Sequence, residues 1–301
     1  MSVENPSIAE LLQLASRLEG VSDTPRLDLE VLLCHVLDEP RSYLFTWPEK
    51  VLEQKTVMQF NELLQRRAEG EPIAHLTGEK EFWSLSLAVN ATTLIPRPDT
   101  ELLVETALNL LDKPTAHVLD LGTGTGAIAL ALASERPNWK IIAVDSVPEA
   151  VILAEKNRQR LGLGNVRLLQ SHWFKEISRQ KFDLIVTNPP YIDAGDPHLK
   201  AGDVRFEPDS ALVSGNNGLA DIELIISGAK DYLIDGGWLL IEHGYLQAEA
   251  VSALLNEQGY GQISTQHDMA GHPRLTLACL NCLSEFCPPR CTEACSSTML
   301  P

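Results

Sequence analysis

Residues 120–126 read Asp-Leu-Gly-Thr-Gly-Thr-Gly and lie between an apolar run at 117–121 and a stretch of helical composition at 127–133. The three glycines allow a tight turn and let a ligand approach the main chain without a Cβ atom in the way. A strand that ends in such a loop and continues as a helix predicts an α/β fold with a cofactor-binding loop. With Ala127 as the third small residue, the loop also satisfies the pattern of NAD or FAD sites, so by itself it does not identify the cofactor.

The chain beyond this loop predicts a doubly wound sheet. Apolar runs alternate with helical stretches after Pro114, as a parallel sheet with crossover helices requires. We predict seven strands, at residues 117–121, 140–144, 166–169, 182–186, 238–241, 262–266 and 274–279.

The N-terminal part has a different periodicity. Ser7 and Glu10 have the spacing of a capping box, and apolar residues at helical spacing follow in three stretches, near 8–18, 29–37 and 57–68. This pattern predicts a small helical bundle.

A third pattern joins the two parts. Trp83, Leu85, Leu87 and Val89 alternate with polar or small residues, which predicts a strand that belongs to a hairpin. We therefore expect a helical domain at residues 1–78, a β-hairpin linker at 79–98, an α/β domain at 99–280 and a Cys-rich tail at 281–301.

Composition and charge limit the classes of function. The chain has 301 residues, of which 44% are hydrophobic and 22% charged, so it is globular and long enough for two domains. Its formal net charge of −17 disfavours a partner that is held through phosphates, and we predict no direct nucleic acid contact. Residues 1–20 lack the basic start of a signal peptide and no apolar run is long enough to span a membrane, so we expect a cytoplasmic protein, as a monomer, without a membrane partner.

Five of the six cysteines crowd the C-terminal end: Cys279, Cys282, Cys287, Cys291 and Cys295. Only Cys34 lies elsewhere, which excludes a disulfide framework for the body of the protein. The first two have the spacing of metal ligands, but the following gaps do not form the two-pair pattern of a zinc site. We predict no metal and a mobile tail without a catalytic role.

An acidic residue ends the second predicted strand. Asp145 lies about 20 residues after the glycine loop, where a carboxylate can accept hydrogen bonds from both ribose hydroxyls of an adenosine. The loop and Asp145 together indicate a cofactor that contains adenosine.

The tetrapeptide Asn188-Pro189-Pro190-Tyr191 follows the fourth predicted strand, at the carboxyl edge of the sheet. An amide or aromatic amine nitrogen is a poor nucleophile because its lone pair is delocalised. If the Asn188 side-chain oxygen and the Pro189 carbonyl each accept one N–H, the lone pair is directed at the methyl donor, while the Tyr191 ring packs on the flat substrate group. Such a transfer needs no strong base, and we interpret His198 and His243 as structural.

The combination of residues 120–126, Asp145 and residues 188–191 resembles the class I S-adenosylmethionine methyltransferases that modify planar nitrogens. Within them, three longer strings look like the release-factor glutamine methyltransferases, the HemK or PrmC group. These strings are GEPIAHL at 70–76, LIPRPDTE at 94–101 and DVRFEP at 203–208. The match runs from about residue 5 to residue 278.

The resemblance implies a helical N-terminal domain that docks the release factor and a Rossmann-like domain with a seven-stranded, mostly parallel sheet whose last strand is antiparallel. It implies that the cofactor is S-adenosyl-L-methionine and that the substrate is the side-chain nitrogen (N5) of the glutamine in the Gly-Gly-Gln motif of peptide chain release factors. Asn188, Pro189 and Tyr191 are then catalytic, and with Pro190 they bind the glutamine amide. The implied cofactor-binding residues are Gly122, Thr123, Gly124, Thr125, Gly126, Asp145, Trp173 and Asn188.

The sequence departs from the family in two places. His172 stands where the family usually has an acidic residue before the aromatic residue of the adenine segment, and the tail from Cys279 has no counterpart. The main alternative is a methyltransferase for an exocyclic amine of adenine or guanine in nucleic acid, which would have to flip its base and grip phosphates. A non-catalytic binding module or a nicotinamide dehydrogenase leaves residues 188–191 unexplained.

Overall fold

The computed structural model describes residues 5–200 and 202–282. The described residues form two compact units. The helical unit comprises the residues up to Lys80 together with Ala88–Ile95 and Asp196–Pro208. The sheet unit comprises Glu81–Leu87, Pro96–Gly195 and the residues from Asp209 on.

The helical unit begins with the predicted capping box. Ser7 Oγ accepts from the Glu10 N–H, and the Glu10 carboxylate accepts from the Ser7 N–H at 2.7 Å. The helices of the N-terminal segment are α1 (Ile8–Leu12), which continues as the 3-10 helix η1 (Gln13–Leu18), then α2 (Pro25–Leu37), α3 (Arg41–Thr46), α4 (Gln54–Ala68) and α5 (Ile73–Thr77). The predicted bundle is confirmed, while the short helices α3 and α5 had not been predicted. Leucines from α1, α2 and α4 and the Phe60 ring form its core.

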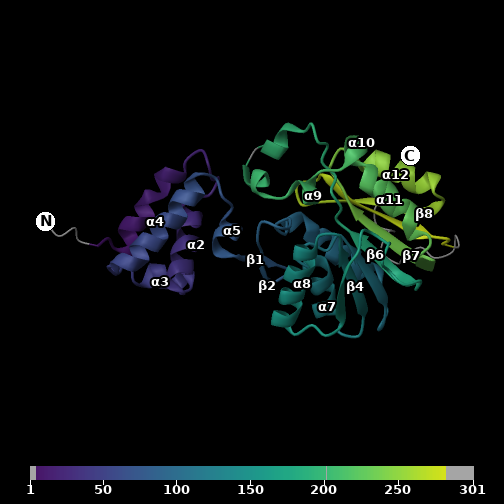
Figure 1. The fold of residues 1–301 in the computed structure, drawn as a ribbon, viewed down its shortest axis with the longest axis horizontal. Coiled ribbons are helices and arrows are strands. Elements are labelled where there is room, and N and C mark those ends of the chain that lie inside the picture. Colours follow the sequence, from purple (N-terminus) through teal and green to yellow (C-terminus); the bar gives the residue numbers. More distant parts are fainter. Residues whose placement is uncertain (1–4, 201, 283–301) are drawn as a thin grey trace, which may run out of the picture. The chain divides into compact units, whose positions relative to one another are not determined.

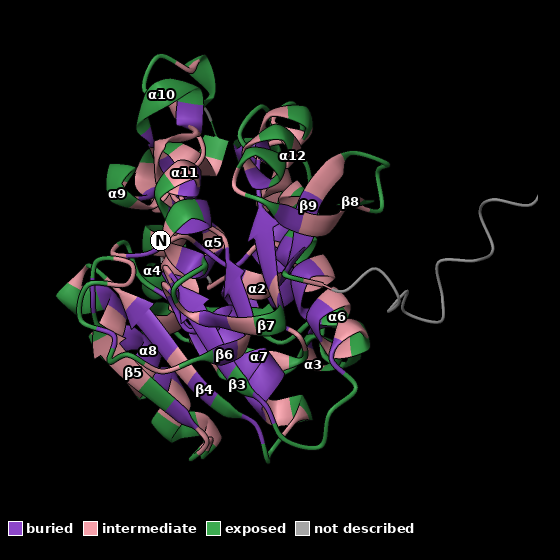
Figure 2. Cartoon of the chain, turned by 90° about the vertical axis from the view of Figure 1, so that its right-hand side faces the viewer, coloured by how far each residue is buried: buried purple, intermediate pink, exposed green. Residues whose placement is uncertain are grey.

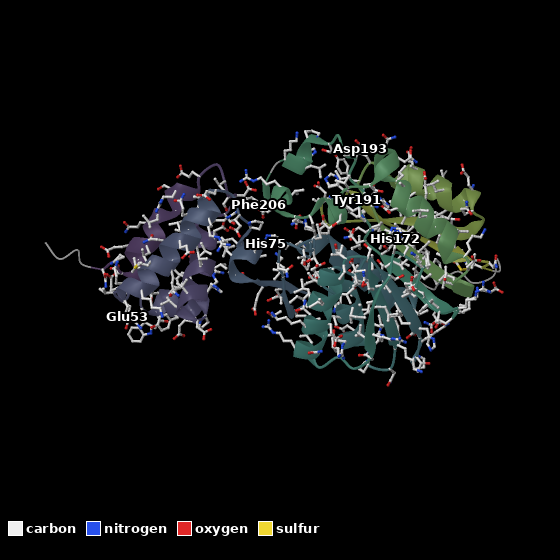
Figure 3. All side chains as sticks on the ribbon, viewed as in Figure 1. Glu53, His75, His172, Tyr191, Asp193 and Phe206 are labelled. Atoms are coloured by element: carbon white, nitrogen blue, oxygen red, sulfur yellow. A yellow bond between two sulfur atoms is a disulfide. The ribbon has the colours of Figure 1, made fainter. Side chains whose placement is uncertain are left out.

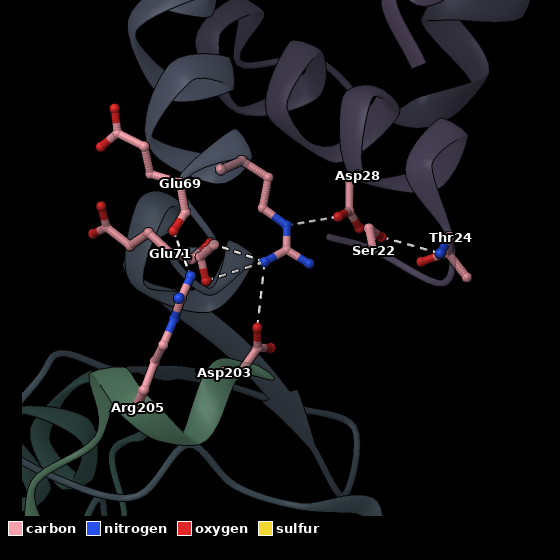
Figure 4. Close-up of polar contacts among 9 residues, drawn as sticks. Ser22, Thr24, Asp28, Glu69, Glu71, Asp203 and Arg205 are labelled. Carbon is pink, nitrogen blue, oxygen red and sulfur yellow. Dashed lines mark hydrogen bonds and ion pairs between the residues drawn. The ribbon is translucent and has the colours of Figure 1, made fainter. Parts of the chain in front are cut away.

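A segment from the second half of the chain completes the helical unit. The 3-10 helices η3 (Pro197–Lys200) and η4 (Gly202–Phe206) lie in it. Buried Arg67 on α4 donates through Nε to Asp28 at 2.7 Å and through Nη1 to Asp203 at 3.3 Å (Figure 4). Arg205 donates to the Glu69 carbonyl. Arg67 Nη1 also donates to the Glu71 carbonyl at 3.1 Å, so two of the family-like strings, 70–76 and 203–208, share one polar network.

The predicted hairpin is present as β1 (Glu79–Phe82) and β2 (Leu85–Ala88). Trp83, which the alternation placed in a strand, lies in the turn instead. Trp83 and Ser84 both have positive φ, 52° and 58°, as a two-residue hairpin turn requires. Within the sheet unit, the Trp83 N–H donates to Glu101 at 2.9 Å and its indole donates to Glu135 at 2.8 Å.

The sheet unit contains all seven predicted strands, which confirms the predicted fold class. They are β3 (His117–Leu121), β4 (Lys140–Asp145), β5 (Val166–Gln170), β6 (Phe182–Thr187), β7 (Leu233–Glu242), β8 (Tyr260–His267) and β9 (Pro273–Leu280). Their order is β5-β4-β3-β6-β7-β9-β8, and β9 is the one described strand of this sheet that runs opposite to the other six. β7 begins five residues before the apolar run at 238 because a bulge with polar residues interrupts its pairing with β6.

Helices cover both faces of this sheet (Figure 1). α6 (Glu101–Leu110) and α7 (Ala127–Glu135) pack against one face, and α11 (Ala220–Ala229) and α12 (Ala248–Glu257) against the other. α8 (Pro148–Leu161) lies beside β4 and β5. Successive residues of the central strands enter opposite cores, so these strands are buried along their length (Figure 2).

Two further features are the cysteines near the C-terminal end and the character of the helices. Cys279 on β9 is bonded to Cys282, so this pair with metal-ligand spacing forms a disulfide. Cys287, Cys291 and Cys295, and with them the predicted tail from residue 283, lie outside the described residues. In the described part of the chain, no helix combines the length and the apolar character that crossing a bilayer demands.

Candidate active site

The register of the parallel strands aligns four positions at one edge of the sheet. Three of them are predicted site residues and the fourth is a further acidic residue. Leu121 of β3 pairs with Val144 of β4 and with Thr187 of β6, and Thr187 pairs with Ile241 of β7. The next residue on each strand is therefore at the same carboxyl edge. These next residues are Gly122, Asp145, Asn188 and Glu242.

The glycine loop is held against β4. The N–H groups of Gly122 and Thr123 both donate to the Val144 carbonyl at 2.9 Å. Gly126, with φ 88°, is the N-cap of α7, where a Cβ atom would lie 2.9 Å from Leu130 Cδ1. The loop conformation therefore depends on glycine.

The two threonines of the loop have structural partners. Thr123 Oγ1 donates to the buried Asp120 carboxylate at 2.6 Å, and the Thr125 carbonyl accepts from the Asn157 side chain at 2.9 Å. Burial raises the pKa of Asp120 to about 7. The hydroxyl of Thr123 thus holds the loop to the strand that precedes it.

Asp145 lies where the sequence predicted, at the end of β4. Its Oδ2 accepts from the Gly124 N–H at 2.9 Å and its Oδ1 from the Val147 N–H at 3.0 Å. Burial raises the pKa of Asp145, while these main-chain N–H groups act in the opposite direction. A carboxylate has about four acceptor positions, so Asp145 can hold the loop and still accept from ribose hydroxyls.

Trp173 faces the glycine loop. A Cβ atom at Gly122 would be 3.4 Å from the Trp173 ring and 4.0 Å from the Asn188 carbonyl oxygen, so the three residues converge on one place. The Trp173 indole donates to Asp221 on α11 at 3.2 Å, and Asp221 also accepts from Ser214 Oγ at 2.7 Å. Asp221 was not predicted from the sequence, because a carboxylate in the first turn of a helix carries no distinctive signal.

His172, the departure from the family pattern, is exposed beside this tryptophan, with ring centroids 5.8 Å apart (Figure 3). His243 and His198, which were interpreted as structural, each have polar neighbours. His243 Nε2 is 2.8 Å from Thr276 Oγ1 and its Nδ1 is 2.9 Å from the Gly244 carbonyl, and burial lowers its pKa. His198 belongs to the helical unit, where it is exposed beside Asp196.

The tetrapeptide leaves β6 at the centre of the edge. Asn188 Nδ2 donates to Glu242 Oε1 at 2.9 Å and to Thr100 Oγ1 at 3.2 Å. Pro189 is buried and Pro190 is half-buried. Tyr191 is half-buried, and burial raises the pKa of its phenol far above the neutral range, so the ring stays uncharged.

Comparison with known proteins agrees with this geometry. Residues 10–78 match the family model described as PrmC N-terminal domain, and residues 112–281 match the one described as Methyltransferase domain. The release factor glutamine methyltransferase of Escherichia coli (strain K12) is 52% identical over 89% of this chain and 96% of its own length. That of Vibrio cholerae serotype O1 is 56% identical over 85% of this chain and 90% of its own. The chain belongs to the release factor glutamine methyltransferase family.

The family resemblance inferred from the sequence strings is therefore confirmed. A solved methyltransferase from Pyrococcus furiosus aligns with a TM-score of 0.52 at 20% identity, over 74% of this chain and 100% of that one. That likeness concerns the fold alone, which is the Rossmann-like fold of the predicted class.

Several residues that were not predicted from the sequence hold the tetrapeptide in place. Gln247 Nε2 donates to the Tyr191 carbonyl at 3.0 Å. A Cβ atom at Gly218, whose φ is 83°, would lie 2.0 Å from the same carbonyl oxygen and 2.7 Å from Gln247 Nε2. Glu242 and Thr100 hold Asn188. Glu242 had a recognisable signal, because it ends an apolar run as Asp145 does.

We expect Gly218→Ala to lower the rate of methyl transfer by about 100-fold, because the added methyl group must displace the Tyr191 carbonyl by an ångström or more. The matched control is Gly215→Ala, whose Cβ atom would make an ordinary contact at 3.6 Å with Ala220. Steady-state kinetics of the two variants make the test. Equal rates in both would show that the close approach at Gly218 does not position the tetrapeptide.

Proposed function

We propose that this chain transfers the methyl group of S-adenosyl-L-methionine to the side-chain amide nitrogen of the Gly-Gly-Gln glutamine in peptide chain release factors. The chain is a methyltransferase and belongs to the release factor glutamine methyltransferase family. The observation that carries the proposal is the Asn188 side chain: its nitrogen donates to Glu242 and Thr100, and no described residue donates to its oxygen. The main-chain carbonyl of Asn188 lies beside Gly122 of the glycine loop.

The residues at the loop fit this cofactor. Gly122, Trp173 and the Asn188 carbonyl surround a place that any side chain at position 122 would fill. We propose that Gly122, Thr123, Gly124, Thr125 and Gly126 border the cofactor, with Asp145 at the ribose and Trp173 beside the adenine. When bound, S-adenosylmethionine supplies an electrophilic methyl group on a positively charged sulfur.

The tetrapeptide prepares the nucleophile. The glutamine nitrogen donates one N–H to Asn188 Oδ1 and the other to the Pro189 carbonyl, which directs its lone pair away from both acceptors. Pro189 and Pro190 restrict the main chain, so the carbonyl keeps its direction at little entropic cost. The neutral ring of Tyr191 offers a flat face for the amide. Orientation and two acceptors would accelerate the transfer. The nitrogen would become acidic only as its new bond to carbon forms and the sulfur–methyl bond breaks, so one of its protons could pass to solvent without a basic side chain.

Family membership favours a protein substrate over the nucleic acid alternative. The net charge of −17 acts in the same direction, since contacts with phosphates require clustered cations. We further propose that the helical unit, residues 1–78 in its main segment, docks the release factor, that 99–280 is the methyltransferase domain, and that the enzyme acts as a monomer in the cytoplasm.

We expect Asn188→Ala to lower methyl transfer by about two to three orders of magnitude, because one of two positioned acceptors is lost. The dissociation constant for S-adenosylmethionine, measured by isothermal titration calorimetry, should change little. Asn256→Ala, an exposed position on α12, serves as the control. Near-normal turnover of the Asn188 variant would remove the proposed mechanism.

Asp145→Ala should weaken the affinity for S-adenosylmethionine by about 10- to 100-fold, because hydrogen bonds to a charged acceptor are lost. The rate at saturating cofactor should fall less than the affinity does. Asp112→Ala, at an exposed position after α6, is the matched control. If the cofactor binds both variants equally well, the assignment of Asp145 to the ribose is wrong.

The substrate is tested by incubating the purified chain with S-adenosylmethionine and an unmethylated bacterial release factor, with DNA and RNA in parallel. Peptide mass spectrometry should locate one added methyl group on the Gly-Gly-Gln glutamine. A release factor with asparagine at that position is the control and should remain unmodified. Methyl groups found only on nucleic acid would make the alternative function correct.

A further inference from the structure

We infer that Glu242 and Thr100 are positioning residues for methyl transfer, because together they hold the Asn188 side-chain amide with its nitrogen inward and its oxygen toward the substrate. The inference rests on the proposed function. It concerns three residues from three separate elements of the sheet unit: the end of the 3-10 helix η2 (Pro98–Thr100), the residue after β6, and the last residue of β7.

Both hydrogens of the Asn188 amide are used in this arrangement. Asn188 Nδ2 donates one hydrogen to Glu242 Oε1, at a nitrogen–oxygen distance of 2.9 Å, and the other to Thr100 Oγ1, at 3.2 Å. An amide nitrogen has two donors and no acceptor, so its capacity is filled. Among the described residues, none donates to Asn188 Oδ1. This oxygen is the atom that the mechanism requires as an acceptor.

The reverse orientation of the amide is disfavoured by its surroundings. A carboxylate only accepts hydrogen bonds, so a turned amide would place Asn188 Oδ1 against Glu242 Oε1. The hydroxyl hydrogen of Thr100 is directed to Glu242, where it acts to lower the pKa of the carboxyl group. The Thr100 oxygen therefore accepts from Asn188 and cannot also donate to it. Because the Glu242 carboxylate only accepts, it determines the direction of all three hydrogen bonds: from Asn188 to Glu242, from Thr100 to Glu242, and from Asn188 to Thr100.

Stability does not account for a carboxyl group at this place. Glu242 is 3% exposed and Thr100 is 5% exposed, and Glu242 Oε2 has no hydrogen-bond partner. Burial raises the pKa of Glu242 to about 7, so at neutral pH its charge opposes folding. A buried ionisable group with an unsatisfied oxygen costs free energy that an apolar residue of similar volume would not. What the Glu242 carboxyl group contributes is the orientation of the Asn188 amide.

The arrangement also predicts a pH dependence. The groups that face Glu242 are Arg274 of β9, which favours its ionised form, and Asp99 of η2, which opposes it. Tyr191 stays neutral, and the lowered pKa of the neighbouring His243 keeps it neutral as well. As pH falls through about 7, the carboxyl group gains a proton and becomes able to donate to an amide oxygen. Above this pH the carboxylate only accepts and so excludes the turned amide; below it, the protonated group can accept or donate and no longer excludes it.

The experiment compares Thr100→Val and Glu242→Gln with wild type, at saturating S-adenosylmethionine and release factor. We expect kcat to fall by about 10- to 100-fold in each, because the acceptor is no longer held in place. The affinity for S-adenosylmethionine should stay within about twofold. Thr100→Ser keeps the hydroxyl group and should recover most of the loss. Thr93→Val is the control, since Thr93 is also buried and its hydroxyl has no partner.

The pH profile separates positioning from a merely structural effect. In wild type, kcat should decline as pH falls below about 7, and this decline should be absent in Glu242→Gln. Unchanged kcat in both variants, while wild type methylates glutamine and Asn188→Ala does not, would overturn the inference and leave the proposed function standing. If wild type transfers no methyl group to glutamine, both fall.

Discussion

The parallel pairing of β3 with β4 and β6 is the constraint on which the rest of the site depends. It places Leu121, Val144 and Thr187 in one register row, so each chain leaves the sheet at the same level. The glycine loop, Asp145 and the tetrapeptide therefore meet at one edge of the sheet. Sliding one strand by a single residue would also exchange its two faces, and the two hydrophobic cores on either side prevent this.

Carboxyl groups near these strand ends serve as anchors for other groups. Asp145 binds the main chain of the glycine loop, Asp221 binds the Trp173 indole, and Glu242 binds the Asn188 amide. In each case an acceptor-only group determines which way a donor points. Glu242 is buried, Asp145 and Asp221 are half-buried, and each holds a group near the carboxyl edge of the sheet.

The helical unit has its own long-range construction. Arg67 is buried between Asp28 and Asp203, which is 136 residues distant in the chain, and the Ile95 N–H donates to Glu207 at 2.8 Å. The segment Asp196–Pro208, which follows the tetrapeptide after four intervening residues, belongs to the helical unit. The chain from residue 188 to residue 208 therefore starts in the sheet unit and ends in the helical unit.

By itself the sequence determined the elements and much of the chemistry. Periodicity and turn residues are local properties, so the helical bundle, the seven strands, the glycine loop, Asp145 and the tetrapeptide could all be predicted. Only the tertiary structure decided which distant groups hold these residues. Thr100 and Glu242 reach Asn188 over 88 and 54 residues. Their meeting depends on strand order, on register and on the entry of η2 into the sheet unit, and no local pattern encodes the partner of a hydrogen bond across that distance.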